Sequence, residues 1–133
     1  MRIVVDTNVL IAALISRGFC HELFEHCFLS HKLVTSIFIL NEVREKLVEK
    51  FKYTIEIADE AIELLRSQMQ LVMPVSLSVQ VSRDGDDDNI LATAIAGRCD
   101  CILTGDKDLL ILTQYEGIKI FNPRQFLDQE NTK

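Results

Sequence analysis

Residues 3–8 read IVVDTN, an apolar run typical of a buried strand that ends on a carboxylate, Asp6. An apolar run of helical length follows directly, over residues 9–15. The same pattern returns near the other end of the chain, where residues 101–106 read CILTGD and end on Asp106. Ligands of open α/β sheets bind at the carboxyl ends of the strands. The sequence therefore predicts an α/β domain with two candidate metal-binding carboxylates, Asp6 and Asp106.

Patterns typical of strands and of helices alternate along the chain. We expect strands at Arg2–Val5, Lys32–Thr35, 71–73, 100–103 and Ile118–Phe121. We expect helices at residues 9–15, 20–29, 36–51, 54–69, 90–96 and 109–112, and a final helical turn from residue 123. This alternation predicts a parallel sheet of about five strands with helices on both faces. Right-handed crossovers would bring the carboxyl ends of all parallel strands to one edge.

Two local patterns are more specific. Ser36 has the position and the chemistry of a helix N-cap. Residues 75–81 alternate apolar and polar side chains, which predicts either an edge strand or an extended connection.

The length of 133 residues and a hydrophobic content of 48% fit one domain with a sizeable core. We place that domain at residues 1–127 and a polar carboxyl-terminal tail at residues 128–133. Asp6 interrupts the first apolar run, which argues against a secretory signal, and no apolar stretch reaches the roughly 18 residues of a membrane span. We therefore expect a cytoplasmic protein. Its cysteines lack the usual zinc-site spacing and are expected to be reduced core residues: Cys20, Cys27, Cys99 and Cys101.

The net charge of −6 disfavours a nucleic-acid partner when only bulk charge is considered. The acids are unevenly placed, however, because Asp84, Asp86, Asp87 and Asp88 lie close together. A bound divalent ion would offset such a cluster locally, so bulk charge does not exclude RNA.

Acidic residues on several elements are expected to meet at the carboxyl edge of the sheet: Asp6, Glu42, Asp87 or Asp88, and Asp106. Like charges about 4 Å apart repel by roughly 4 kcal/mol at an effective dielectric near 20, so such a cluster favours a bound cation. Oxygen ligands favour Mg²⁺ or Mn²⁺. An ion of this kind, with room for water, is suited to phosphodiester hydrolysis.

Each candidate has a structural alternative. Glu42 stands four residues before Lys46 and could form a surface ion pair. Asp87 and Asp88 could complement a helix dipole, and Asp6 and Asp106 could cap helices.

Residues next to the acids, and the three histidines, also have more than one possible role. Asn8 and Thr104 could orient a carboxylate or a metal-bound water, or could satisfy turn backbone. His21, His26 and His31 are five residues apart, a spacing that rotates around a helix, so we expect no shared metal site among them.

Four blocks of the sequence together resemble the PIN-domain family. They are Asp6-Thr7-Asn8, Ser36 with Leu40-Asn41-Glu42-Val43, residues 84–94 (DGDDDNILATA) and residues 104–110 (TGDKDLL). The resemblance extends over residues 1–126, and within the family the chain looks most like the toxin components of toxin–antitoxin systems related to VapC-type toxins.

The resemblance implies a three-layer α/β/α sandwich with strand order 3-2-1-4-5. Asp6 and Asp106 would then flank the point where the strand order reverses, a place where open α/β sheets bind ligands. Carried over by motif, the acidic quartet is Asp6, Glu42, Asp87 and Asp106. Asp88 and Asp84 remain open alternatives for the third position, and Asp108 is a peripheral candidate.

The resemblance also implies Mg²⁺- or Mn²⁺-dependent ribonuclease activity, a homodimer and inhibition by an antitoxin. Our leading hypothesis is therefore an endoribonuclease that cleaves single-stranded RNA with metal-activated water. Asp6 with Asp87 or Asp88 would hold the main ion, and Glu42 and Asp106 would complete the site. The alternative is a catalytically weak RNA- or partner-binding module. A phosphotransfer domain with Asp6 as acceptor is a third, weaker interpretation.

Overall fold

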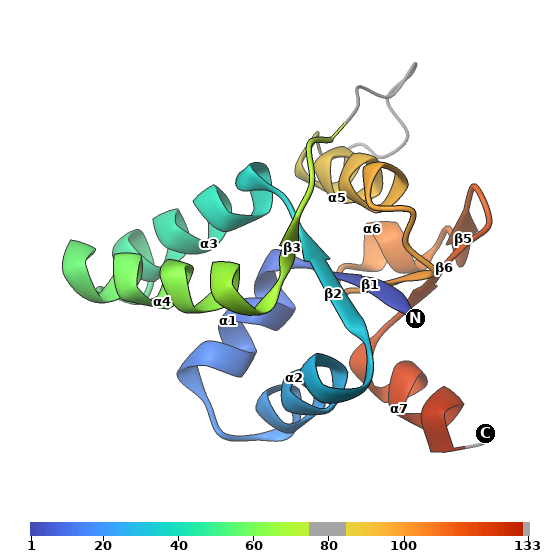
Figure 1. Ribbon diagram of the computed structural model, residues 1–133, viewed down its shortest axis with the longest axis horizontal. Helices are drawn as coiled ribbons and strands as arrows, with labels where there is room; N and C mark the ends of the chain where they lie inside the picture. Colours follow the sequence, from blue (N-terminus) through green and yellow to red (C-terminus); the bar gives the residue numbers. More distant parts are fainter. Residues whose placement is uncertain (75–84, 132–133) are drawn as a thin grey trace.

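The computed structural model describes residues 1–74 and 85–131, and the side chains of residues 85–87 are outside that description (Figure 1). The strands are β1 (Arg2–Val5), β2 (Lys32–Thr35), β3 (Gln70–Leu71), β4 (Cys101–Leu103), β5 (Gln114–Tyr115) and β6 (Ile118–Phe121). The helices are α1 (Thr7–Ile15), α2 (Phe19–Ser30), α3 (Ile37–Glu49), α4 (Ile55–Gln68), α5 (Gly85–Ala96), α6 (Lys107–Leu110) and α7 (Pro123–Asn131). The pattern predicted for residues 75–81 lies outside the described residues.

These strands form one sheet in the order β3-β2-β1-β4-β6-β5. The first five in that order are mutually parallel, which confirms the predicted order 3-2-1-4-5 with β6 as the fifth predicted strand. In Figure 1, α5 and α6 lie above the sheet and α2 and α7 lie below it, so the predicted three-layer α/β/α architecture is also confirmed.

The antiparallel edge strand β5 was not predicted. It pairs with β6 through the partners Tyr115 and Ile118. Glu116 and Gly117 form the turn between them, with φ angles of 51° and 79°. Two consecutive residues with positive φ are typical of the tight type I′ hairpin turn. A strand of two residues is too short to show alternation, and only the turn glycine could have indicated it.

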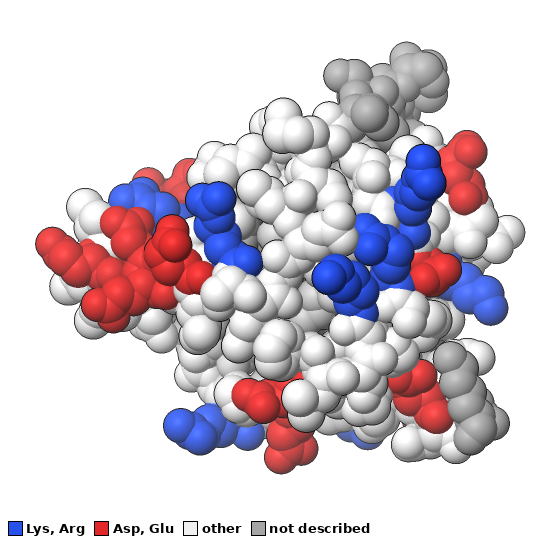
Figure 2. Space-filling view, in the orientation of Figure 1, with Lys and Arg blue, Asp and Glu red and all other residues white. Residues whose placement is uncertain are grey.

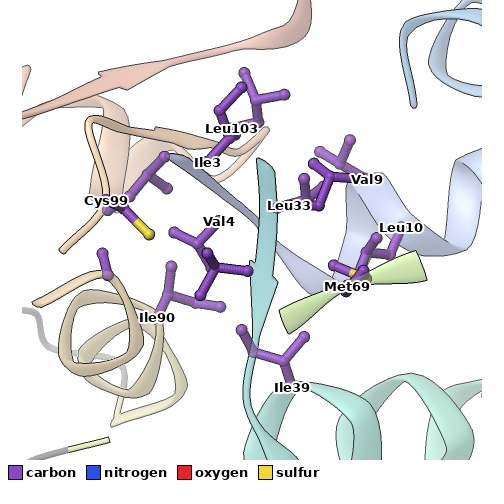
Figure 3. Close-up of a cluster of buried hydrophobic side chains, with 14 of the residues drawn as sticks. Ile3, Val4, Val9, Leu10, Leu33, Ile39, Met69, Ile90, Cys99 and Leu103 are labelled. Atoms are coloured by element: carbon purple, nitrogen blue, oxygen red, sulfur yellow. The ribbon is translucent and has the colours of Figure 1, made fainter. Parts of the chain in front are cut away.

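The central strand β1 is buried on both faces, as a parallel strand between helical layers should be. Figure 3 shows Ile3, Val4 and Leu33 in the middle of the core, with Ile90 and Cys99 on one side and Val9, Leu10 and Met69 on the other. Ile3 and Val4 have no exposed side-chain surface. The sheet thus holds the end of β1, and with it Asp6, in a fixed position.

Helix and strand boundaries differ from the predictions at a few places. Ser36 is the N-cap residue of α3, as predicted, but its hydroxyl accepts a hydrogen bond from Thr93 on α5 at 2.8 Å. The third strand is shorter than predicted and begins earlier, at Gln70–Leu71.

The final helix is longer than the single turn predicted. Asn122 and Gln125 exchange backbone-to-side-chain hydrogen bonds of 2.7 and 2.9 Å, a capping box that starts α7. Residues 128–131, assigned from sequence to a polar tail, lie in the last turn of this helix.

All four cysteines are free thiols. Cys27, Cys99 and Cys101 are buried, as predicted, whereas Cys20 is half-buried. Burial raises the pKa of Cys27, Cys99 and Cys101 to about 12, so these thiols stay protonated at neutral pH. Within the described part of the chain, none of the helices has both the length and the apolar character needed to cross a membrane.

Candidate active site

Asp6 directly follows β1 and is only 7% exposed. Its backbone N–H donates to the carbonyl of Leu103 on β4 at 2.8 Å, which fixes Asp6 at the edge where the two strands end. One carboxylate oxygen accepts a hydrogen bond from Thr7 N–H and the other from the Thr104 hydroxyl, both at 2.6 Å. Asp6 is therefore the N-cap residue of α1, but each ionised oxygen retains a further lone pair for a cation.

Thr104 connects the two acids that were predicted from the strand ends. Its buried hydroxyl donates to Asp6 and accepts from the backbone N–H of Asp106 at 3.0 Å. It thus orients a carboxylate and satisfies turn backbone, the two roles that the sequence left open. Asp106 in turn caps α6 by accepting from Asp108 N–H at 2.8 Å.

Glu42 approaches the same cluster from α3. Its carboxylate accepts a short hydrogen bond from the hydroxyl of Thr7, whose N–H is bonded to Asp6. Asn8, by contrast, has an exposed side chain that accepts from Lys46 Nζ at 3.1 Å. Asn8 therefore holds a lysine at the rim of the site, which differs from the carboxylate-orienting role considered for it.

The third acidic position is only partly described. Asp88 lies in the first turn of α5 and is half-buried. Residue 87 lies in the same turn, but its side chain is outside the described part, as are those of residues 84 and 86. Thr93 anchors α5 to Ser36, which follows the carboxyl end of β2. The assignment of Asp87 as the third ligand, with Asp88 and Asp84 as alternatives, remains a prediction.

Electrostatics make the Asp6 carboxylate the distinctive group of this cluster. Burial raises its pKa above the ordinary value of 3.8, and hydrogen bonds from Thr104 and Thr7 lower it. The nearby charge of Asp106 raises the pKa further, and the charge of Lys46 lowers it by less than any of these. None of the described lysines or arginines forms an ion pair with Asp6. Buried carboxylates of this kind need a compensating positive charge, and an all-oxygen donor set fits Mg²⁺ or Mn²⁺.

A groove of about 410 Å³ lies beside this cluster, between α3 and α5. It is lined by Phe38, Ile39, Asn41, Glu42, Glu45, Lys46, Glu49, Lys50, Asn89 and Ile90. Glu42 is thus shared by the groove and the carboxylate cluster, so a ligand in the groove would reach the cluster through Glu42.

A model of the PIN domain matches residues 2–108 of the chain. The chain belongs to the PIN-domain family. It is also 28% identical to the uncharacterized protein MJ1680 of Methanocaldococcus jannaschii, over 97% of this chain and 91% of that protein.

Solved structures show the same fold at low sequence identity. One is the structure of VapBC2 from Rickettsia felis bound to a DNA fragment from its promoter. The present chain matches it with a TM-score of 0.65 and 13% sequence identity, over 92% of this chain and 98% of that chain. Mycobacterium tuberculosis VapC20, described as a sarcin–ricin loop cleaving toxin, has a TM-score of 0.62 and 14% identity, covering 88% and 98%. These similarities support the PIN architecture.

Two threonines of this PIN domain were missed as site residues. Thr7 stands between Asp6 and Asn8 in the first block. Its N–H donates to Asp6 and its hydroxyl donates to Glu42, so it connects the two carboxylates. Thr93 lies two turns into α5 and its buried hydroxyl reaches Ser36. Its position within residues 84–94, one of the four blocks that resemble the PIN-domain family, could have indicated that Thr93 supports the site.

His26 and His31 come together in the structure, although no shared metal site was expected among the three histidines. His31 lies just beyond α2 in an extended conformation, so helical spacing no longer separates it from His26. Both rings contact the carboxylate of Glu130 on α7. His21 instead contacts the carbonyl of Ala13 at 3.0 Å.

The raised pKa of Asp6 predicts how the metal-free protein responds to pH. Between 3.8, the ordinary value, and the higher folded value, the folded state binds more protons than the unfolded state. Stability therefore falls as the pH rises through that interval. Asp6→Asn removes this penalty, so its stability relative to the wild type should increase as the pH rises above the ordinary aspartate pKa of 3.8. Urea unfolding in EDTA measures the difference, and a pH-independent difference would contradict the prediction.

Proposed function

We propose that this PIN domain is a Mg²⁺- or Mn²⁺-dependent endoribonuclease that cleaves single-stranded RNA. The observation that carries the proposal is the buried Asp6 carboxylate, whose pKa is raised and which lies where β1 and β4 end side by side. This is the point at which the strand order reverses, where open α/β sheets bind ligands. Family membership supports the same conclusion.

The proposed metal ligands are Asp6, Glu42, Asp106 and an acid of α5, either Asp87 or Asp88. A bound divalent ion would lower the pKa of a water molecule and neutralise charge on the phosphoryl oxygens. The protein's own contribution is to hold the acids in place. Thr104 fixes Asp6 relative to Asp106, and Thr7 fixes Glu42 relative to Asp6.

The groove between α3 and α5 offers a path for RNA. Lys46 and Lys50 line it and could contact phosphate groups, although Glu45 and Glu49 line it too. In the face shown in Figure 2, acidic side chains gather at the left, over α4, whereas basic side chains cluster at the right, around the amino-terminal strand. Mixed charge in the groove favours RNA binding that depends on the divalent ion.

We further propose that the enzyme is a cytoplasmic, homodimeric toxin of a toxin–antitoxin pair and is inhibited by an antitoxin protein. The similarity to VapC20 and to VapBC2 supports this proposal. A short reading frame next to the gene, whose product copurifies with this chain and suppresses its activity, would be the expected partner.

Metal removal tests the proposed reaction. Purified protein should cleave a labelled single-stranded RNA with Mg²⁺ or Mn²⁺ and leave 5′-phosphate and 3′-hydroxyl ends. EDTA should abolish cleavage, and excess Mg²⁺ should restore it, because the proposed reaction depends on a water molecule and phosphoryl oxygens activated by the ion. Cleavage that persists in EDTA would contradict the metal dependence.

The cleavage assay, combined with calorimetry, distinguishes a second candidate function. The net charge of −6 and the acids of the groove leave affinity for RNA unexplained, so a catalytically weak RNA- or partner-binding module is the second candidate. Calorimetric binding of Mg²⁺ or Mn²⁺ without RNA cleavage would support that module over the nuclease.

A further inference from the structure

A second group of potential metal ligands lies away from the carboxylate cluster. It consists of His26 on α2, His31 just after α2, and Glu130 on α7. One ligand atom from each side chain lies within 4.8 Å of the others. His31 precedes β2 and therefore stands at the amino-terminal edge of the sheet. Asp6 stands at the opposite edge, roughly 17 Å away along the strand direction at about 3.3 Å per residue.

Hydrogen bonds within this group already bring its potential ligand atoms together. Nε2 of His26 lies 3.0 Å from Glu130 Oε1, and Nε2 of His31 makes a still shorter contact with the same oxygen. Both imidazoles thus direct their Nε2 atoms at one carboxylate oxygen. Ligand distances of about 2.0–2.2 Å to a shared ion require the three atoms to rearrange only locally.

The two more enclosed ligands are fixed by their surroundings. The side chains of His31 and Glu130 are each 11% exposed, whereas that of His26 is 44% exposed. On its other side, Nδ1 of His31 lies 3.1 Å from the amino nitrogen of Met1, and the His31 ring packs against Phe126. These contacts on two sides hold the His31 ring in one orientation. His26, being exposed, can turn toward an ion and leaves a path for it to enter.

The chemistry of the donors selects the type of ion. Two imidazole nitrogens and one carboxylate suit Zn²⁺ and other divalent transition ions, whereas Mg²⁺ prefers oxygen ligands alone. Three protein ligands leave one position of a tetrahedral ion for water.

We propose that His26, His31 and Glu130 form a Zn²⁺-type site that fastens the carboxyl-terminal helix α7 to α2. Glu130 lies beyond residues 2–108, the segment that matches the PIN domain, so the site depends on an element outside that match. The proposal is independent of nuclease activity. Loading of the site would stabilise the docking of α7 without using the carboxylate cluster.

Zinc titration of the full-length, chelator-treated protein tests this site. Calorimetry with ZnCl₂ should detect a site of one ion per chain that His26→Ala weakens by at least about 10–100-fold. His26→Ala removes an exposed side chain and should fold normally. The matched control is His21→Ala, on the same helix, which should leave zinc affinity unchanged. Asp6→Asn should retain the site, which separates it from the carboxylate cluster.

Stability and hydrogen exchange provide readouts that do not depend on activity. Zinc at a hundredfold excess over its dissociation constant should raise the Tm by roughly 10 °C and should slow amide exchange in α7 but not in α4. Glu130→Gln should abolish both effects. Equal zinc affinity in wild type and His26→Ala, or zinc binding that leaves α7 exchange unchanged, would overturn the proposal.

Discussion

Asp6→Asn is expected to slow RNA cleavage on the order of 10²–10³-fold at saturating Mg²⁺. A divalent ion contributes several kcal/mol of charge stabilisation in the transition state, and each 1.36 kcal/mol corresponds to about tenfold in rate. The substitution removes the negative charge of a carboxylate that is buried at the junction of β1 and β4. Initial rates on a labelled single-stranded RNA, measured across a range of Mg²⁺ concentrations, would show both a lower maximum and a higher Mg²⁺ requirement.

The fold should tolerate this substitution. An asparagine oxygen can still accept from Thr7 N–H, and its amide can donate to the hydroxyl of Thr104. Asp100→Asn is the matched control, because Asp100 lies at the opposite edge of the sheet, where it accepts from Arg2 N–H at 2.7 Å. Full activity in Asp6→Asn would eliminate Asp6 as a ligand. An equal loss in Asp100→Asn would mean that the effect reflects general destabilisation.

The sheet was predictable because its strands carry strong and separate signals. Ile3, Val4 and Ile102 belong to apolar runs that end abruptly at polar residues, and helical patterns of suitable length connect them. Such alternation leaves few topologies once crossovers are right-handed. β5 escaped prediction because a two-residue strand has no period, and its existence depends on the Glu116–Gly117 turn.

Proximity at the carboxyl edge was predictable, but the hydrogen bonds within the site were not. Strand ends placed Asp6 and Asp106 together, since parallel strands share an edge. The sequence could not show that Thr104 connects them or that Thr7 connects Asp6 with Glu42, because those contacts depend on side-chain rotamers and on the approach of α3.

The histidines illustrate a different limit. Helical spacing separates His26 from His31 only while the helix continues, and α2 ends at Ser30. Glu130 joins them from a helix about a hundred residues later in the chain, which no local pattern can reveal. The helix expected at residues 20–29 also ended before His31, so helical spacing did not apply to that residue.

Glu42→Gln should lower cleavage by about 100-fold, the second-largest effect among the single substitutions. Glutamine keeps an oxygen that can accept a hydrogen bond from the hydroxyl of Thr7, so the contact between α1 and α3 should be retained. What disappears is one negative charge of the cluster that would hold the ion. The expected signature is a requirement for more Mg²⁺ with a modest change in RNA affinity, measured by metal titration of cleavage and by RNA binding in Ca²⁺.

Glu45→Gln is the matched control, because Glu45 lies one turn further along α3, lines the same groove and is exposed. If Glu42 acts through the ion, Glu45→Gln should keep its Mg²⁺ requirement and could bind RNA slightly more tightly, since it removes a charge that repels phosphate. Equal losses in both variants would mean that α3 acts only through its overall charge. A loss confined to Glu42→Gln would place Glu42 with Asp6 in the metal site, because Thr7 connects those two carboxylates directly.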